Sequence, residues 1–415
     1  MANRNTPRSK IDAGPLIDVT VVGGAGHAGL PLALAFAGEG LRVLIYDINA
    51  EALDMLRHGR LPAVEIGAEP LLERGLAHGQ LLFSGDVRDI PGSGAIIVTI
   101  GTPVDEFSNP SIASVQECFD TLLPQLSDGQ LIVLRSTVFP GTTDWIDEYL
   151  RRSGRTMKVA FCPERVVQGH ALQEFRTMPQ IVSGTTLEAE EAAAELFALI
   201  SPELVRVRPI EAEFAKLFNN AYRYIQFAAA NQFYTIADSA GVDYSNVLKA
   251  MTHNYPRANG FPSPGFAAGP CLYKDTVQLA AFAQNQFSLG QAAMSVNEGL
   301  PIYLVRQMEQ RWDLHRMTVG LLGMAFKADV DDTRSSLSYK LKKLLAVRAK
   351  QVLTTDPFVT HDPSLLPLDE VIVRSDILVL CTPHACYRDL DLKGKPLVDV
   401  WGFHSPVRLL AEADV

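Results

Sequence analysis

The stretch Asp18-Val-Thr-Val-Val22, followed by Gly24-Ala-Gly-His-Ala-Gly29, decides the fold of the N-terminal part of the chain. A β-branched run that leads into glycines spaced G-x-G-x-x-G predicts a strand that turns tightly into a helix. The next apolar run, Leu41–Tyr46, predicts a second strand, and it ends at Asp47, 23 positions after the first glycine. This β-turn-α-β unit is typical of a dinucleotide-binding domain.

The glycines and the acidic residue suggest which cofactor binds. Gly24, Gly26 and Gly29 permit a tight turn and a close approach of the backbone to a pyrophosphate, which sits at the helix N-terminus. Asp47 is expected to accept hydrogen bonds from the ribose hydroxyls, and its charge would repel a 2′-phosphate. The predicted cofactor is therefore NAD rather than NADP. The alternative for this stretch is a purely structural glycine-rich turn.

Later apolar runs predict further strands of the same sheet: Gly94–Ile100, Gln130–Leu134 and Lys158–Phe161. Each of these strands is followed by polar residues, among them Thr102, Thr137 and Glu164. Open parallel sheets bind ligands in the crevice beyond the carboxyl ends of their strands, so these side chains are expected to line a site. Thr102 and Thr137 are assigned to the cofactor. Glu164 is a candidate general base, with a structural glutamate as the alternative.

The pattern then changes to helical spacing and returns to strands. Residues 271–311 are expected to be helical with breaks at Gly290 and at 299–301, and the C-terminal strands begin at Met317. The predicted fold class is α/β, with two doubly wound Rossmann-like domains joined by a helical middle segment. The expected boundaries are 1–17 for a disordered leader, 18–204 for the NAD-binding domain, 205–312 for the helical middle segment and 313–415 for the C-terminal Rossmann-like domain.

Composition limits the possible partners. The 415 residues include 37 Lys and Arg against 47 Asp and Glu, a net charge of −10, and 47% are hydrophobic. This is an ordinary globular composition, and an acidic balance without basic blocks argues against nucleic-acid and membrane-surface binding. The five cysteines are scattered and the histidines show no metal-ligand spacing, so no metal is predicted and a reducing cytoplasm is expected.

Cys271 is the most informative candidate for chemistry. Gly269 and Pro270 signal a helix start, which places Cys271 at a helix N-terminus, where the dipole and free amides lower the pKa of a thiol. Asp275 lies four residues on and shares its face. A thiol and a carboxylate that face one cleft suit covalent catalysis with proton transfer, while a buried structural cysteine is an equally good interpretation of this stretch alone.

Lys216 and Asn220 form a second pair. Their spacing of four places them on one helix face among apolar neighbours, where a positive charge and an amide donor could stabilise an oxyanion. A snorkelling lysine with an incidental asparagine is the more common interpretation of such a pair by itself. His27, inside the glycine run, is interpreted as a packing residue, because nothing near it in the sequence supplies a partner.

Taken together, these motifs resemble the UDP-glucose/GDP-mannose dehydrogenase family of nucleotide-sugar 6-dehydrogenases. They occur in the family's order across residues 18 to 402, which is essentially the whole chain. The matching pieces are Val22–Pro31, Arg135–Thr137, Cys162–Arg165, Ala215–Asn220, Gly269–Asp275, Val296–Glu298, Gly323–Lys327 and Asp331–Ser336.

The resemblance implies an NAD-dependent, four-electron oxidation of a sugar C6 alcohol to a uronate, with a thiohemiacetal and a thioester on Cys271. It further implies that Lys216 and Asn220 stabilise charge on the reacting oxygen. Asp275, with Thr137, would position a water, and Glu164 would serve proton transfer and thioester hydrolysis.

The resemblance also assigns residues to the nucleotide and to a partner subunit. Lys327 would hold the diphosphate of a UDP-sugar, Phe326 would lie beside the base, and Arg334 would reach towards the cofactor. Arg257 matches an arginine that in relatives reaches a neighbouring subunit's sugar, so a homodimer is implied.

The choice among possible substrates depends on one residue. Arg165, in Pro-Glu-Arg, resembles the branch acting on UDP-N-acetylmannosamine or UDP-N-acetylglucosamine, with UDP-glucose second and GDP-mannose third. Two-electron dehydrogenases that need no cysteine and a catalytically silent nucleotide-sugar-binding protein are the rival classes.

Overall fold

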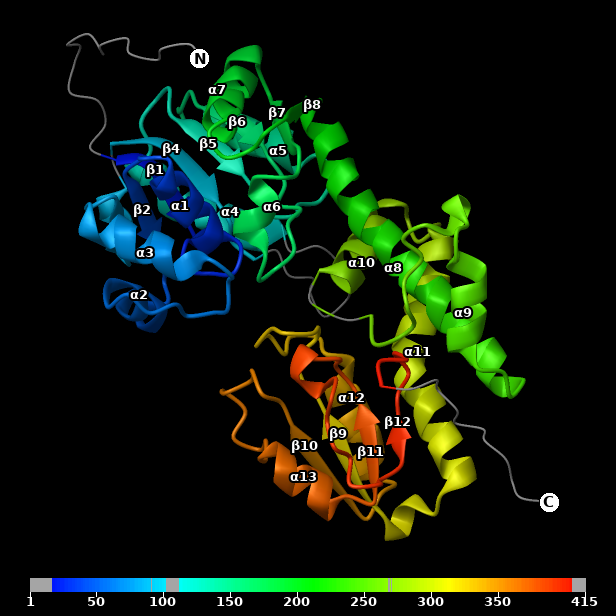
Figure 1. Cartoon of the computed structure of the whole chain (residues 1–415). Helices are drawn as coiled ribbons and strands as arrows, with labels where there is room; N and C mark the ends of the chain where they lie inside the picture. The colour runs from blue at the N-terminus through cyan, green and yellow to red at the C-terminus, as the bar shows by residue number, and fades with distance from the viewer. Residues whose placement is uncertain (1–16, 91, 102–111, 268, 270, 405–415) are drawn as a thin grey trace. The chain divides into compact units, whose positions relative to one another are not determined.

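The computed structural model describes residues 17–404, except 91, 102–111, 268 and 270 (Figure 1). The predicted leader lies almost entirely outside these residues. The described chain divides into two compact units, one ending at Lys216 and the other beginning at Leu217. They are called here the N-terminal unit and the C-terminal unit.

Within its described residues, the N-terminal unit contains an eight-stranded sheet with the order β3-β2-β1-β4-β5-β6-β7-β8. The sheet is parallel except where β7 pairs antiparallel with β6. The strands are β1 Ile17–Val22, β2 Val43–Tyr46, β3 Leu81–Ser84, β4 Ser93–Val98, β5 Leu131–Leu134, β6 Lys158–Phe161, β7 Gln180–Gly184 and β8 Leu204–Arg206. The central strand β1 pairs with both β2 and β4, so that Val19 lies opposite Val43 on one side and Ala95 on the other.

Helices pack on both faces of this sheet. Successive residues of one strand enter different cores: Ile97 joins the cluster formed with α1, while Ile96 joins the cluster formed with α4 and α5. Burial on both faces explains why these strands read as continuous apolar runs. The helices are α1 Gly29–Gly38, α2 Ala50–Arg57, α3 Ala68–Ala77, α4 Ile112–Leu122, α5 Thr142–Arg152, α6 Ala171–Phe175 and α7 Leu187–Phe197.

Four helices open the second part of the chain. They are α8 Pro209–Ser239, which begins in the N-terminal unit, α9 Tyr244–Thr252, α10 Leu272–Phe282 and α11 Ser288–Arg311. The predicted breaks at Gly290 and at 299–301 are both wrong, because α11 continues through Gly290 and Pro301, and the interruption between α10 and α11 lies at residues 283–287. Proline removes one backbone bond from a helix. Burial of Leu300 and Leu304 on the packed side of α11 provides stabilisation that offsets this loss.

The C-terminal sheet resembles a shorter version of the first. In the described residues it has four parallel strands in the order β10-β9-β11-β12. Its elements are β9 Thr318–Leu322, α12 Leu337–Ala346, β10 Gln351–Thr355, α13 Leu368–Arg374, β11 Ile377–Leu380 and β12 Leu397–Val398. Short 3-10 helices lie at Val87–Asp89, Leu123–Gln125, η3 Pro256–Ala258, Leu314–Arg316 and η5 Ala385–Tyr387. The predicted α/β class, with two doubly wound sheets and helices between them, is confirmed.

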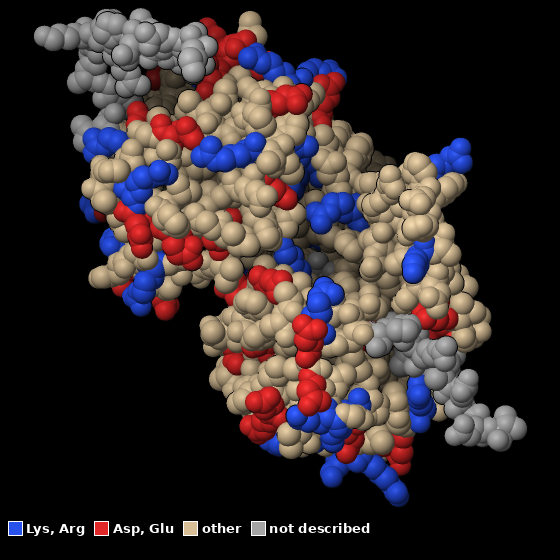
Figure 2. All heavy atoms as spheres, in the orientation of Figure 1, with Lys and Arg blue, Asp and Glu red and all other residues tan. Residues whose placement is uncertain are grey.

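The surface carries both signs of charge. Figure 2 shows Lys and Arg interspersed with Asp and Glu on the face of each unit that it presents. Among the described residues, no helix combines the length and the apolar character that crossing a bilayer requires.

Candidate active site

The glycine loop after β1 has the close packing expected of a dinucleotide turn. A Cβ on Gly29 would lie 2.4 Å from the Gly23 carbonyl oxygen, and a Cβ on Gly24 would lie 2.6 Å from that of Val21. Gly26 is different, since its Cβ would meet only the Gly23 oxygen at 3.3 Å, and the residue is exposed. Gly24 and Gly29 therefore serve the turn and the helix packing, while Gly26 leaves open space where a pyrophosphate could approach.

Asp47, at the end of β2, holds this loop in place. Its carboxylate accepts hydrogen bonds from the Ala25 amide and from the Asn49 amide, both at 3.0 Å. These bonds fix the side chain beside the glycine loop while leaving it partly exposed. The fit to a dinucleotide is good, although ribose binding by Asp47 remains a prediction.

His27 does have a polar partner, contrary to its interpretation as a packing residue. Its Nδ1 lies 2.9 Å from Nε2 of Gln168. Gln168 lies after β6 and is 141 residues away from His27 in the sequence, so sequence spacing could not have identified the pair. The contact joins the glycine loop to the segment that carries Glu164.

Glu164 is held by a buried arginine. Its Oε2 accepts from Nε of Arg135 at 3.0 Å and lies 2.8 Å from the Nη2 of the same guanidinium, and Oε1 accepts from the amides of Arg165 and Val166. Arg135 has 1% exposure. Sequence analysis assigned no separate role to Arg135, yet it neutralises the charge of the Glu164 carboxylate and fixes its orientation. Arg165 donates to the Pro179 carbonyl.

Glu213 is a second residue whose role the sequence did not suggest. It lies on α8, and its carboxylate accepts from the Gly141 amide at 2.6 Å and from the Thr143 amide at 2.8 Å. A carboxylate at a helix N-terminus satisfies free amides and interacts favourably with the helix dipole. Burial raises the pKa of the Glu213 carboxyl. Because Glu213 fastens the first turns of α8 to α5, it positions Lys216, which is buried one turn later.

In the C-terminal unit, Cys271 occupies the N-cap of α10, as predicted, and it is exposed. Asp275 is fully buried on the same helix, and its amide donates to the Cys271 carbonyl at 2.9 Å. Asn220, buried on α8, donates from Nδ2 to the Asp275 Oδ2 at 2.5 Å. Lys274 Nζ lies 3.4 Å from the other carboxylate oxygen. The Asn220 amide, expected to point at the substrate oxygen, is therefore also the donor that orients Asp275.

The loop after β9 and the segment after it also approach Cys271. A Cβ on Gly269, two residues before Cys271, would lie 2.6 Å from the Phe326 ring, so that ring packs against the start of the cysteine turn. Arg334 donates to the Asp332 carboxylate. The pKa of the Arg334 guanidinium is raised, chiefly by this hydrogen bond and less strongly by the charges of Asp332 and Cys271. Cys271, Phe326 and Arg334 thus gather in one part of this unit.

Other predicted site residues lie elsewhere or cannot be described. Arg257, in η3, is exposed and donates to the Tyr255 hydroxyl at 3.3 Å. Thr137 follows β5, and Lys327 follows Phe326 in the loop after β9, and both are partly buried. Thr102 lies outside the described residues.

Neither a metal cluster nor a disulfide is present in the described part of the chain. In these residues no group of three or more His, Cys, Asp or Glu side chains is arranged to hold a metal ion. All five cysteines lie among them, and none is joined to another by a disulfide bond.

A glycine loop with the close packing of a dinucleotide turn in one unit and a second doubly wound sheet in the other are features of a dehydrogenase that binds nucleotides. The chain belongs to the UDP-glucose/GDP-mannose dehydrogenase family. The family's NAD binding domain matches residues 17–201, its central domain residues 210–299 and its UDP binding domain residues 320–406.

Relatives along the whole chain agree with this membership. The UDP-N-acetyl-D-mannosamine dehydrogenase of Pyrococcus horikoshii is 29% identical and aligns over 89% of this chain and 90% of its own. The NDP-N-acetyl-D-galactosaminuronic acid dehydrogenase of Ralstonia nicotianae is also 29% identical, and the alignment covers 95% of this chain and 97% of that enzyme. The solved structure of a UDP-glucose dehydrogenase from Pyrobaculum islandicum has a TM-score of 0.86 at 26% identity, covering 95% of this chain and 96% of its own.

Proposed function

We propose that the protein oxidises the C6 primary alcohol of a UDP-N-acetylhexosamine to the uronate, using NAD and a covalent intermediate on Cys271. The observation that carries this proposal is an exposed cysteine at the N-terminus of α10, one turn from a buried carboxylate that is oriented by Asn220. Two-electron dehydrogenases need no such cysteine.

The reaction balances in four steps. The alcohol loses a hydride and a proton to give an aldehyde, and the Cys271 sulfur adds to its carbonyl carbon to form a thiohemiacetal. Loss of a second hydride and proton gives a thioester, and water then cleaves the carbon–sulfur bond to release the carboxylate and the thiol. Gly24, Gly26, Gly29, Asp47 and Thr137 would hold NAD, which would take up one hydride in each oxidation, with NADH replaced by a second NAD between the two.

The protein's own groups account for the charge and proton changes. Lys216 and Asn220 would stabilise the oxygen as it gains negative charge, because preorganised donors act most strongly at developing charge. Asp275 and Glu164 would hold and deprotonate the water that attacks the thioester. The fixed orientation of each carboxylate, by Asn220 and by Arg135 respectively, supports these assignments.

The nucleotide sugar is assigned to the C-terminal unit. Lys327 would contact the diphosphate and Phe326 the base, while Arg334 would face both the cofactor and the cysteine. We further propose the three-part organisation with boundaries near residues 204 and 312, in which the helical segment carries the dimer contacts.

An N-acetylated sugar is preferred for two reasons. Arg165 follows Glu164 in the Pro-Glu-Arg motif, and the relatives from Pyrococcus and Ralstonia are both named for N-acetylhexosamine nucleotides. UDP-glucose is the second candidate, favoured by the structural likeness to the Pyrobaculum enzyme.

We also propose a homodimer that works in the cytoplasm. One face of α8 exposes large apolar side chains at helical spacing, namely Phe218, Tyr222, Phe233 and Ile236, with exposures of 44–62%. Exposed apolar stripes of this kind mark protein–protein contacts. Arg257 lies exposed in the same unit and would reach the partner's sugar. Five cysteines without a disulfide among them suit a reducing compartment.

The test is an NADH assay over UDP-N-acetylmannosamine, UDP-N-acetylglucosamine, UDP-glucose and GDP-mannose, with the acid product identified by mass spectrometry. The proposal expects the highest kcat/KM with an N-acetylated sugar. Cys271→Ser should bind NAD normally and form no uronate. Normal uronate output from that variant, or no NADH with any nucleotide sugar, would refute the proposal.

A further inference from the structure

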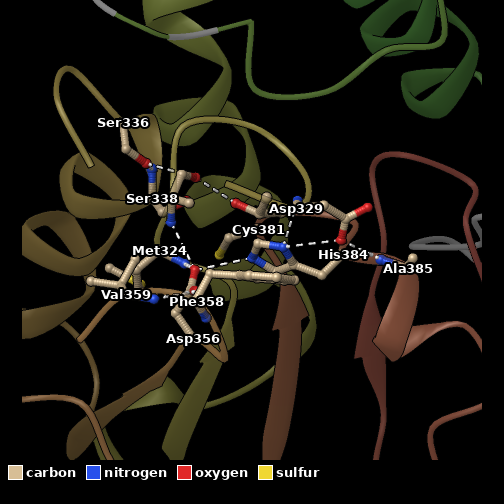
Figure 3. A network of polar contacts seen from close by, with 12 residues as sticks. Met324, Asp329, Ser336, Ser338, Asp356, Phe358, Val359, Cys381, His384 and Ala385 are labelled. Atoms are coloured by element: carbon tan, nitrogen blue, oxygen red, sulfur yellow. Dashed lines mark hydrogen bonds and ion pairs between the residues drawn. The ribbon is translucent and has the colours of Figure 1, made fainter. Parts of the chain in front are cut away.

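The loop Gly323–Val330, which follows β9, carries Phe326 and Lys327. It is fixed in the C-terminal unit by segments that lie after β10 and after β11 (Figure 3). At Gly323, with φ of +91°, a Cβ would lie 2.5 Å from Cβ of Thr382, so the loop begins in close contact with the segment after β11. Thr382 also donates from its hydroxyl to the Ala325 carbonyl at 2.7 Å.

Asp356 holds the first half of this loop. From the end of β10, its Oδ2 accepts from the amides of Met324 at 2.6 Å and Ala325 at 2.8 Å. The arrangement repeats that of the N-terminal unit, where Asp47 at the end of β2 accepts from the Ala25 amide. Asp356, however, is almost completely buried, and a histidine occupies the space beside its carboxylate.

That histidine is His384, which has no exposed surface. Its Nδ1 accepts a hydrogen bond from the Asp329 amide at 2.9 Å, and its Nε2 lies 3.0 Å from Oδ2 of Asp356. A nitrogen that accepts from an amide carries no proton, so the network assigns the neutral tautomer with the proton on Nε2, donated to Asp356. One imidazole thus uses both nitrogens to join the two ends of the loop (Figure 3).

The C-terminal end of the loop, at Asp329, is held by contacts with His384 and Ala385. Asp329 has a φ of +57°, in the left-handed region that non-glycine residues seldom adopt. Its backbone amide donates to His384, and its Oδ1 accepts from the Ala385 amide at 3.0 Å. These two contacts tie Asp329 to η5 and stabilise its left-handed backbone conformation.

The surroundings of His384 hold its imidazole in place and keep the Asp356 carboxyl ionised. Phe358 and Tyr387 pack against the imidazole with centroid distances of 4.9 and 5.3 Å. Burial would raise the pKa of the Asp356 carboxyl, but the hydrogen bond from His384 and those from the amides of Ala325 and Phe358 lower it overall. The carboxylate therefore remains an acceptor for the loop amides.

We infer that His384 is a positioning residue for the nucleotide half of the substrate: it locks the loop Gly323–Val330 through Asp356 and Asp329 and so preorganises Phe326 and Lys327. This inference rests on the proposed function, in which that loop contacts the UDP-sugar. A preorganised loop binds its ligand without a separate ordering cost, so loss of the histidine should weaken nucleotide binding.

The experiment measures binding of UDP by calorimetry to the full chain, with NAD as a second ligand. In His384→Leu both contacts are lost, and Kd for UDP should rise about tenfold while Kd for NAD changes less than about twofold. His384→Gln can still donate to Asp356, and His384→Asn can still accept from Asp329, so each should lie between wild type and Leu. In turnover, KM for the UDP-sugar should rise much more than kcat falls.

The matched control is Cys386→Ser, an exposed position on the same segment, which should bind UDP as the wild type does. If the Leu variant does not fold, the Gln and Asn variants decide the question. A folded His384 variant with wild-type UDP affinity, or one that loses UDP and NAD binding equally, would overturn the positioning role. Failure of the wild-type protein to bind UDP would instead overturn the proposed function.

Discussion

Asn220 on α8 donates to the carboxylate of Asp275 on α10, with 2.5 Å between Nδ2 and Oδ2. Both side chains are buried, and the two residues are 55 positions apart in the sequence. The bond orients Asp275 one turn from Cys271. The amide that we propose to face the substrate oxygen is therefore already bonded to the Asp275 carboxylate.

Two substitutions distinguish a catalytic role of this pair from a structural one. Asp275→Asn keeps the shape and a hydrogen bond, so the Tm should change little, while kcat should fall about 100-fold because the charge that handles protons is lost. Asn220→Ala removes the amide that donates to the buried Asp275 carboxylate and should lower the free energy of unfolding by about 1–3 kcal/mol. Thermal unfolding and NADH assays measure both effects. An Asp275→Asn enzyme with near-normal kcat would exclude Asp275 from the reaction.

Two substitutions in the glycine loop are expected to differ in their effect on the Tm. Gly29→Ala forces a methyl group to within 2.4 Å of the Gly23 oxygen, so the variant should unfold at a lower temperature and lose NAD binding. Gly26→Ala meets only one atom at 3.3 Å, so its Tm should be close to that of the wild type while NAD affinity falls at least about tenfold. Calorimetry with NAD and thermal unfolding check the pair. Equal Tm losses in both variants would contradict this division of roles.

Glu164→Gln should slow the hydrolysis of the covalent intermediate. The substituted amide would keep an acceptor for Arg135 but would lack the charge needed to deprotonate water, so an initial burst of NADH should be followed by turnover about 100-fold slower. Mass spectrometry of the quenched enzyme should find the acyl group on Cys271. Normal steady-state turnover, or a burst with unmodified Cys271, would remove Glu164 from the hydrolysis step.

The exposed stripe on α8 predicts the effect of surface charge on assembly. Tyr222→Glu with Ile236→Glu places carboxylates in the proposed dimer contact, so sedimentation velocity should show monomers at protein concentrations where the wild type is a dimer. Val373→Glu on α13 is the control, because it changes an equally exposed apolar residue elsewhere. A wild type that sediments as a monomer, or a double variant that remains dimeric, would refute the assignment.

The elements that sequence analysis predicted well depend on local patterns. The strands β1, β5 and β6 and the N-cap position of Cys271 follow from apolar runs and turn residues that are adjacent in the chain. The contacts that orient the site do not, since Arg135–Glu164, Asn220–Asp275 and Thr143–Glu213 join residues 29, 55 and 70 positions apart. A single sequence carries no signal for such pairs.

The errors in the predicted helix breaks have a similar cause. Gly299 and Pro301 are local helix breakers, and the sequence therefore predicts an interruption. Burial of the surrounding turns of α11 overrides this preference, and the helix remains continuous. Tertiary packing, which the local pattern does not report, decides the outcome.

The most direct test of the covalent mechanism is the ratio of NADH formed to nucleotide sugar consumed, measured at completion with the preferred substrate. Oxidation through a thioester on Cys271 removes two hydrides from the same carbon before release, so two NADH and one uronate should form for each sugar, with no free aldehyde. A ratio of one NADH per sugar, with an aldehyde or ketone as the product, would contradict the four-electron reaction.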